Sequence, residues 1–169
     1  MKVVFSHGKE SGPWGSKIRT LADIAGDFGC STDSLDYQGI PDPDERALQL
    51  IDYLNLESED FILVGSSMGG YVSLVAAKEK RPLGVFLLAP ALYIPGYSHQ
   101  SYSCDGPVQI VHGWSDNVIP VENSIRYAKE ANCTLHLING DHRLNSSLDE
   151  VVVLFKSFLG FVTKEYRGH

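Results

Sequence analysis

The amino-acid sequence predicts an α/β fold with a mostly parallel sheet. Short apolar runs, which are typical of buried strands, alternate along the chain with longer segments whose apolar residues recur at helical spacing. With 169 residues, of which 43% are apolar and 21% charged, the chain has the size and composition of a single domain over residues 1–169. No internal repeat or low-complexity linker divides it.

The first three predicted elements are a strand, a helix and a strand at the edge of the sheet. Residues 3–5 are an apolar run. Residues 16–28 carry one apolar helical face and precede Gly29, a typical helix stop. The members of that face are Ile18, Leu21, Ala22, Ala25 and Phe28. Residues 31–37 are mostly polar, which favours an edge position because an edge strand does not need full burial.

The next helix has a well-defined predicted start. Asp42 is the expected N-cap, Pro43 takes the first helical position, and Glu45 follows three residues after the cap. We expect its buried stripe to consist of Ala47, Leu48, Ile51 and Leu54. A strand over residues 61–64 and a helix that continues to about Arg81 follow.

The second half of the chain continues the alternation. Residues 85–89 are apolar on both faces, as expected of a central parallel strand. Residues 90–106 predict an irregular loop, rich in Tyr, Ser and Pro. Strands are predicted over residues 108–111 and 134–138, with a helix over 121–131 between them.

The final predicted element is an amphipathic helix over residues 147–161. Its inward-facing residues are expected to be Leu148, Val151, Val152, Phe155, Phe158 and Leu159. Ser147 and Glu150 have the spacing of a capping box. We expect residues 164–169 to form a frayed tail.

The bulk properties exclude several kinds of partner. The net charge of −7 argues against nucleic acid or an anionic membrane as the main partner, because both need clustered Lys and Arg. Cys30, Cys104 and Cys133 are too widely spaced to suggest a disulfide framework or a cysteine zinc site, and no histidine pair has metal-binding spacing. We therefore expect no metal, and a cytoplasmic protein without a signal-peptide core or an apolar run of the roughly 20 residues that span a membrane.

The most informative motif is Gly65-Ser66-Ser67-Met68-Gly69, which follows the third predicted strand. It matches the G-x-S-x-G nucleophile elbow, in which a sharp strand-to-helix turn holds a serine hydroxyl clear of the backbone. The symmetric flanking glycines select Ser67 over Ser66 as the nucleophile. The alternative is an ordinary turn serine.

A serine nucleophile needs a general base, and the base needs a carboxylate that orients it. In a parallel sheet such groups collect beyond the carboxyl ends of the strands. Asp116 follows the fifth predicted strand and His142 follows the sixth, so we predict a triad of these two residues with Ser67. Two alternatives remain, in which Asp116 caps the next helix or Asp141 supplies the carboxylate, although Asp141 adjoins His142 and reaches behind its ring with difficulty.

Two backbone amides are the expected oxyanion hole. One belongs to Met68, the residue after the nucleophile, and the other to Lys9 in the loop after the first strand, where Gly8 permits close approach. Candidate substrate-binding side chains are Trp14, Tyr71, Tyr93, Trp114 and Arg143. For the aromatic residues the alternative is packing. Lys9 and Arg143 would favour a substrate with a negative group, unless they are merely solvated. His7 and His112 are expected to be structural hydrogen-bonding residues.

Four segments carry a resemblance to a known family: residues 5–8, 65–70, 112–116 and 140–142. Over nearly its whole length the chain resembles the α/β-hydrolase superfamily, and in particular its small bacterial hydrolases and esterases without a lid. The resemblance implies a three-layer α/β/α sandwich with about six parallel strands, in the order second, first, third, fourth, fifth, sixth. It also implies that the chain begins at the family's usual third strand and that the short loop 90–106 replaces a cap domain.

Together the motifs and the resemblance predict a serine hydrolase that needs no cofactor. The expected substrates are small, soluble carboxylic esters or thioesters, cleaved through an acyl-enzyme on Ser67. An amidase or peptidase with the same triad is one alternative, and a binding protein that keeps the fold without turnover is another. The sequence does not indicate an oligomeric state.

Overall fold

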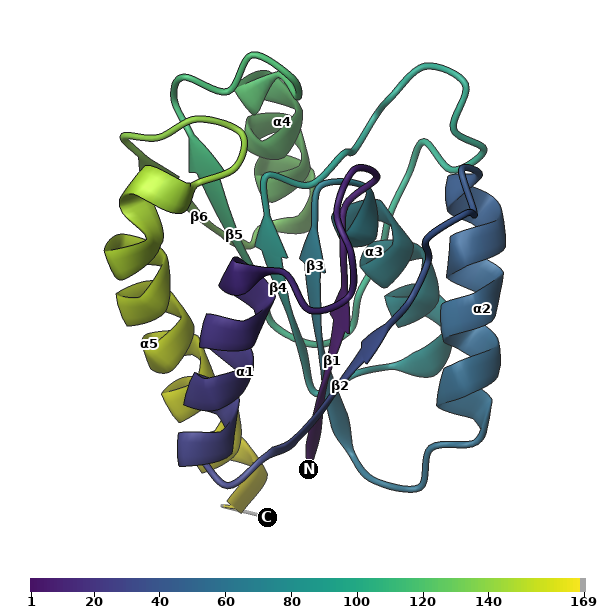
Figure 1. The fold of residues 1–169 in the computed structure, drawn as a ribbon, viewed down its shortest axis with the longest axis vertical. Helices are drawn as coiled ribbons and strands as arrows, with labels where there is room; N and C mark the ends of the chain where they lie inside the picture. The colour runs from purple at the N-terminus through teal and green to yellow at the C-terminus, as the bar shows by residue number, and fades with distance from the viewer. Residues whose placement is uncertain (168–169) are drawn as a thin grey trace.

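The structure, a computed structural model, describes residues 1–167, with side chains through residue 165. A six-stranded parallel sheet forms its centre (Figure 1), with the strand order β2-β1-β3-β4-β5-β6. This order and the parallel pairing confirm the predicted topology. The strands are β1 (Lys2–Ser6), β2 (Ser31–Leu35), β3 (Phe61–Ser66), β4 (Gly84–Leu88), β5 (Val108–Gly113) and β6 (Thr134–Ile138).

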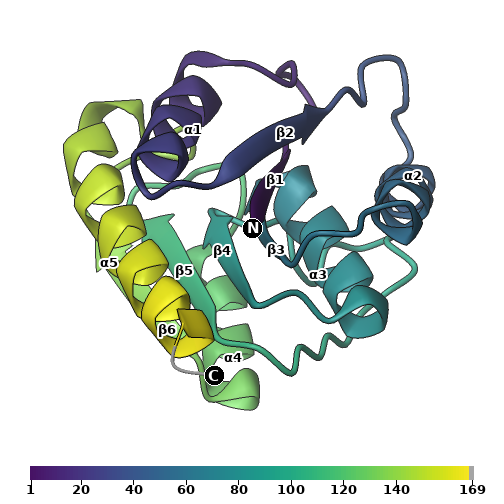
Figure 2. The same ribbon diagram turned by 90° about the horizontal axis from the view of Figure 1, so that it is seen from below.

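Helices cover both faces of the sheet, which completes the three-layer sandwich (Figures 1 and 2). One face carries α1 (Ser16–Asp27) and α5 (Leu148–Arg167), and the other carries α2 (Pro43–Asn55), α3 (Met68–Lys80) and α4 (Val121–Ala131). The inner strands contribute buried side chains to both layers, because successive residues of a strand point to opposite faces. Among the described residues, no helix is both long and apolar enough to cross a membrane.

The start of α2 agrees with its predicted cap, but its buried face differs from the prediction. The Asp42 carboxylate accepts hydrogen bonds from the amides of Asp44 and Glu45 at 2.8 and 3.4 Å. Leu48, predicted to be buried, is 62% exposed. The predicted Ala47 and Leu54 are buried and Ile51 is partly buried, but Arg46 and Leu50 are also buried. The buried face is therefore rotated relative to the prediction and includes Arg46. A pattern of apolar residues does not predict a buried arginine.

The last helix also departs from its predicted ends. The Ser147 hydroxyl donates to the Asn139 carbonyl instead of forming a capping box, and a short 3₁₀ turn (Asn145–Ser147) precedes α5. The helix continues through Arg167, past the predicted end at Phe161, so the part of the predicted frayed tail up to Arg167 is helical. Val162 is buried with the α1–α5 layer, which anchors this extra length. Residues 168–169 of that tail lie outside the described residues.

Residues 90–106 form the predicted loop, with no helix or strand. The loop is tied to α2 and α3 by polar contacts. The Ser98 hydroxyl donates to Asp44 on α2 at 2.6 Å, and the His99 amide donates to the Tyr71 hydroxyl on α3 at 3.2 Å. The loop therefore lies over the α2–α3 side of the molecule.

Candidate active site

The turn from β3 into α3 has the conformation that a nucleophile elbow requires. Ser67 lies at φ 54° and ψ −119°, a strained combination for a residue with a side chain. Three backbone hydrogen bonds hold it there: its amide donates to the Leu88 carbonyl, and its carbonyl accepts from the amides of Gly70 and Ala91, each at 2.9 Å. The strain is thus maintained by neighbouring strand and loop backbone.

The elbow glycines are required by the close approach of backbone segments. A Cβ atom on Gly69 would lie 1.9 Å from the Ser6 carbonyl oxygen, and one on Gly65 would lie 2.3 Å from the Gly69 carbonyl oxygen. Neither distance is possible for real atoms. The G-x-S-x-G pattern therefore reflects how tightly the first turn of α3 packs against β1 and β3.

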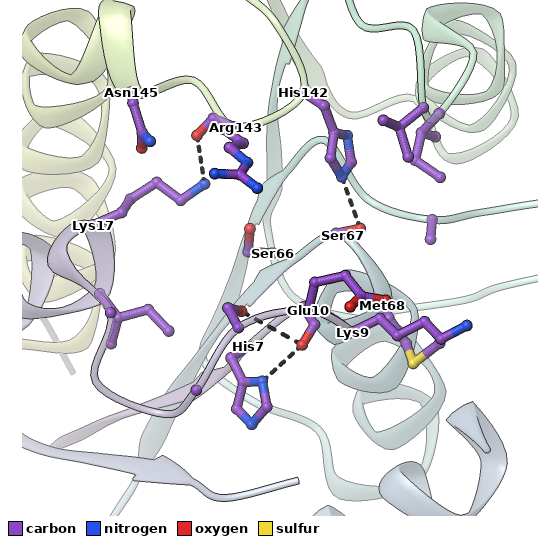
Figure 3. A pocket seen from close by; sticks show the side chains of 18 of the residues that line it. His7, Lys9, Glu10, Lys17, Ser66, Ser67, Met68, His142, Arg143 and Asn145 are labelled. Carbon is purple, nitrogen blue, oxygen red and sulfur yellow. Dashed lines mark hydrogen bonds between the residues drawn. The ribbon is translucent and has the colours of Figure 1, made fainter. Parts of the chain in front are cut away.

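The structure brings the three residues of the predicted triad together. The Ser67 Oγ atom lies 3.0 Å from Nε2 of His142 (Figure 3). The other ring nitrogen of His142, Nδ1, lies 2.7 Å from Oδ2 of Asp116. His142 is partly exposed, while the Asp116 side chain is fully buried. A continuous line of hydrogen bonds therefore connects the serine hydroxyl to a buried carboxylate.

The carboxylate of Asp116 accepts from four donors. Its Oδ1 atom accepts from the amides of Val118 and Ile119, both at 2.8 Å, and Oδ2 accepts from His142 and from Nε2 of His112 at 2.9 Å. Burial alone would raise the pKa of Asp116, but the hydrogen bonds from His142 and the two amides outweigh it and hold the pKa below its usual value. The carboxylate is therefore ionised at neutral pH.

His112 contacts this acid directly, which the sequence analysis anticipated only as a structural role. Its Nε2 faces two acceptors, Asp116 and the Ile119 carbonyl, so it carries the proton, and Nδ1 then accepts from the Ser124 hydroxyl at 2.7 Å. The ring is completely buried, and this burial lowers its pKa, which keeps it neutral. The four-residue spacing from His112 to Asp116 at a strand end was the available signal.

Asp141, the alternative carboxylate, is engaged elsewhere. Its Oδ1 atom accepts from the amides of Arg143 and Leu144, both at 3.0 Å, and so closes the turn that carries His142. The carboxylate behind the His142 ring is that of Asp116.

The loop after β1 lies against the nucleophile through Gly8. A Cβ atom on Gly8 would lie 3.4 Å from that of Ser67. The Gly8 carbonyl accepts from Nδ1 of His7 at 2.7 Å, from Nη1 of Arg46 at 3.2 Å and from the Ser11 hydroxyl at 3.4 Å. Because the C=O and N–H groups of a trans peptide point in opposite directions, these donors turn the Lys9 N–H away from themselves.

Two buried side chains fix the direction of the Gly8 carbonyl. His7 accepts from the Tyr37 amide at its Nε2 atom, so its Nδ1 atom carries the proton donated to Gly8, and burial lowers its pKa. Arg46 is only 2% exposed and also donates to the Ile40 carbonyl at 2.6 Å. No carboxylate among the described side chains forms an ion pair with Arg46 within 4.0 Å, and its guanidinium lies over the Tyr37 ring, 5.5 Å from the centroid. No sequence motif marks Arg46 as part of the site.

A cavity of about 540 Å³ surrounds the Ser67–His142 pair. Both predicted oxyanion residues, Lys9 and Met68, line it. The other apolar lining residues are Ile18, Ala91, Ile94, Tyr97, Val118 and Ile119. The charged lining residues are Lys9, Glu10, Lys17 and Arg143. No group of three or more His, Cys, Asp or Glu side chains suited to a metal ion occurs in the described part of the chain.

Of the side chains predicted to bind substrate, only Arg143 lines this cavity. Tyr71 is fully buried beneath the loop 90–106, and the Tyr93 hydroxyl donates to Glu130 at 2.6 Å. Trp14 and Trp114 are 38% and 58% exposed and do not line the cavity. Nearness in sequence to the catalytic end does not determine where these rings point.

Comparison with known proteins gives matches in structure only. No protein-family model and no curated protein sequence matches the chain. A protein of the α/β-hydrolase superfamily from Xanthomonas campestris pv. campestris is 25% identical, with a TM-score of 0.86 over 94% of this chain and 98% of that one. Est1E from Butyrivibrio proteoclasticus is 20% identical, with a TM-score of 0.80 over 96% of this chain and 88% of that one.

A third match is the type II thioesterase BorB from the borrelidin biosynthetic cluster. It is 13% identical, with a TM-score of 0.73 over 94% of this chain and 90% of that one. At this level of identity the likeness concerns the fold. These matches extend over nearly the whole chain.

Proposed function

We propose that this chain, which has the α/β-hydrolase fold, is a serine hydrolase that cleaves carboxylic esters or thioesters of small, soluble acyl groups. The observation that carries the proposal is the hydrogen-bonded line from Ser67 through His142 to the buried carboxylate of Asp116. Hydrolases among the structural neighbours, including a thioesterase, support it. One structure of Est1E contains ferulic acid, a carboxylic acid like those that ester hydrolysis releases.

In the first half of the proposed reaction, Nε2 of His142 takes the proton of the Ser67 hydroxyl while Oγ attacks the substrate carbonyl carbon. The negative charge that forms on the carbonyl oxygen is stabilised by the amides of Met68 and Lys9. Asp116 stabilises the protonated imidazole. His142 then gives its proton to the departing alcohol or thiol, which leaves an acyl group on Ser67.

The second half reverses these roles with water as the nucleophile. His142 removes a proton from the water molecule, which attacks the acyl-enzyme carbonyl. When the tetrahedral intermediate collapses, the proton returns to Ser67 Oγ and the carboxylic acid is released. No cofactor is needed at any step.

The test is a chain-length series of p-nitrophenyl esters and acyl-CoA thioesters, assayed beside Ser67→Ala. We expect turnover of short-chain substrates, and a fall in kcat of about 10³-fold or more in the variant, because the acyl-enzyme route is lost. Aminoacyl amides belong in the same panel, since a preference for them would favour the amidase alternative. A folded wild-type protein that cleaves no ester or thioester would overturn the proposal.

A further inference from the structure

The cavity lining combines charged and apolar residues around Ser67. Figure 3 shows Lys17, Arg143 and Asn145 on one side of the serine and Met68 and Lys9 on the other. Val118 and Ile119 add further apolar surface to the lining. A substrate with its carbonyl carbon at Ser67 would extend into both regions, because acyl and leaving groups lie on opposite sides of the bond that breaks.

Lys17 is a partly desolvated cation that forms no ion pair with a described side chain. Its ammonium, in the first turn of α1, donates to the Arg143 carbonyl at 2.8 Å, which is a neutral acceptor. Burial lowers the pKa of Lys17 to about 8, and the negative charge of Asp141 opposes this only in part. No carboxylate within residues 1–165 forms an ion pair with Lys17, since Asp141 directs Oδ1 to two backbone amides. Two of the three N–H groups of the ammonium remain for a ligand.

Arg143 adds a second cation at the same place. Its guanidinium lines the cavity and forms no ion pair with any described side chain. The cavity wall thus carries three cationic side chains, Lys9, Lys17 and Arg143, against one carboxylate, Glu10. This local balance is opposite in sign to the net charge of the chain, which is −7. A concave site of one charge concentrates ligands of the other.

We propose that the substrate bears a carboxylate on one side of its scissile bond, held by Lys17 and Arg143. A carboxylate placed between these side chains would accept charge-assisted hydrogen bonds from both and would neutralise the buried ammonium. The inference rests on the proposed ester or thioester hydrolysis and specifies its substrate class.

Two matched substrate pairs test the inference and identify the anionic side. The first pair compares p-nitrophenyl hydrogen glutarate with p-nitrophenyl valerate, so that only the acyl group gains a carboxylate. The second pair compares 3-carboxy-4-nitrophenyl butyrate with p-nitrophenyl butyrate, so that only the leaving group gains one. Each substrate is assayed with the wild type, Lys17→Met, Arg143→Gln and a control variant, Lys156→Met, whose exposed side chain on α5 lies outside the cavity.

For one of the two pairs, we expect the wild type to prefer the anionic member by about 10- to 100-fold in kcat/KM, the usual range for a charge-assisted contact. Lys17→Met and Arg143→Gln should remove most of this preference by lowering turnover of the anionic ester more than that of its neutral partner, while Lys156→Met leaves the preference intact. The neutral esters reveal any disturbance of the turn that carries His142.

The inference is overturned if the wild type shows no preference for either anionic ester, or if the two cavity variants lower anionic and neutral turnover equally. Both outcomes leave the proposed hydrolysis standing, because the neutral esters are still cleaved. Failure to cleave any of the four esters would instead overturn the proposed function, and the inference with it.

Discussion

Asp116 shows how individual residues stabilise a buried negative charge in the candidate site. Its carboxylate is fully buried and receives two backbone amides and two imidazole N–H groups. A buried carboxylate with one donor would be expensive to keep ionised, and four donors offset that cost. His112 is therefore a positioning residue that fixes the acid, while the acid fixes the tautomer of His142.

Replacing this acid with its amide tests the role directly. In Asp116→Asn the fold should persist, but the His142 ring loses the charge that stabilises its protonated form. We expect kcat for the best p-nitrophenyl ester to fall by about 10³- to 10⁴-fold, with a smaller change in KM. Steady-state kinetics measure this, and circular dichroism checks the fold. A variant with near wild-type kcat would exclude Asp116 as the acid of the triad.

The same variant makes a prediction about acid stability. Because the pKa of Asp116 is lowered in the folded protein, its charge contributes stability above the unfolded-state pKa of about 3.9, and this contribution is lost as pH falls through the folded-state pKa. The difference in free energy of unfolding between wild type and Asp116→Asn should therefore be largest near neutral pH and shrink below about pH 4. Urea unfolding across this range measures it. A difference independent of pH would contradict the ionised, hydrogen-bonded state of the carboxylate.

Arg46 makes the second residue-scale prediction. It donates to the Gly8 carbonyl from the opposite side to the Lys9 amide, so losing it should loosen the oxyanion donor more than substrate binding. We expect Arg46→Met to lower kcat by about tenfold or more, with a smaller change in KM.

Arg46→Lys is the matched variant, because an ammonium can still donate to the Gly8 carbonyl, and it should recover part of the lost kcat. Thermal unfolding of both variants separates a catalytic effect from simple destabilisation. If Arg46→Met keeps kcat and raises only KM, the guanidinium does not orient the oxyanion loop.

At the scale of the elements, α3 packs so closely against β1 that no side chain fits at position 69. We expect Gly69→Ala to reduce the free energy of unfolding by about 1–3 kcal/mol or more, because its methyl group would meet the Ser6 carbonyl at 1.9 Å. Gly26→Ala in α1 is the control, since no atom lies within 4 Å of its Cβ position. That change should be neutral or stabilising by about 0.5–1 kcal/mol. Equal effects of the two substitutions would contradict the account of the elbow.

The sequence predicted elements well where one pattern dominates. The capped start of α2, the bounds of α4 and the span of β6 follow from local signals that nothing overrides. The errors arise where contacts between elements, and not the local sequence, determine which side chains are buried or where a helix ends. On α2, Arg46 is buried and Leu48 is exposed. Helix α5 extends past its predicted end, and Val162 in this added length is buried.

At the scale of the whole molecule, the strand order explains why the sequence places the three residues of the proposed triad close together. Ser67 follows β3, Asp116 follows β5 and His142 follows β6, and parallel strands bring these ends to one edge of the sheet. Chain order and strand ends are sequence properties, so the three residues can be assigned without coordinates.

The cavity lining was much less predictable from sequence. Lys17, which lines the cavity, and Arg46, which donates to the Gly8 carbonyl beneath it, come from helices whose side-chain directions depend on packing, and no motif marks either residue. Tyr71 adjoins the elbow in sequence, but α3 turns its ring beneath the loop 90–106. The residues that line the cavity depend on such orientations, whereas the positions of Ser67, Asp116 and His142 depend on topology.

The central claim, that Ser67 is an activated nucleophile, is tested most directly by covalent labelling. The wild-type protein, Ser67→Ala and Ser66→Ala are treated with a fluorophosphonate, and the modified peptide is identified by mass spectrometry. We predict stoichiometric labelling of the wild type at Ser67, retained in Ser66→Ala and abolished in Ser67→Ala. Absence of labelling in folded wild-type protein, or a label that persists in Ser67→Ala, would contradict the claim.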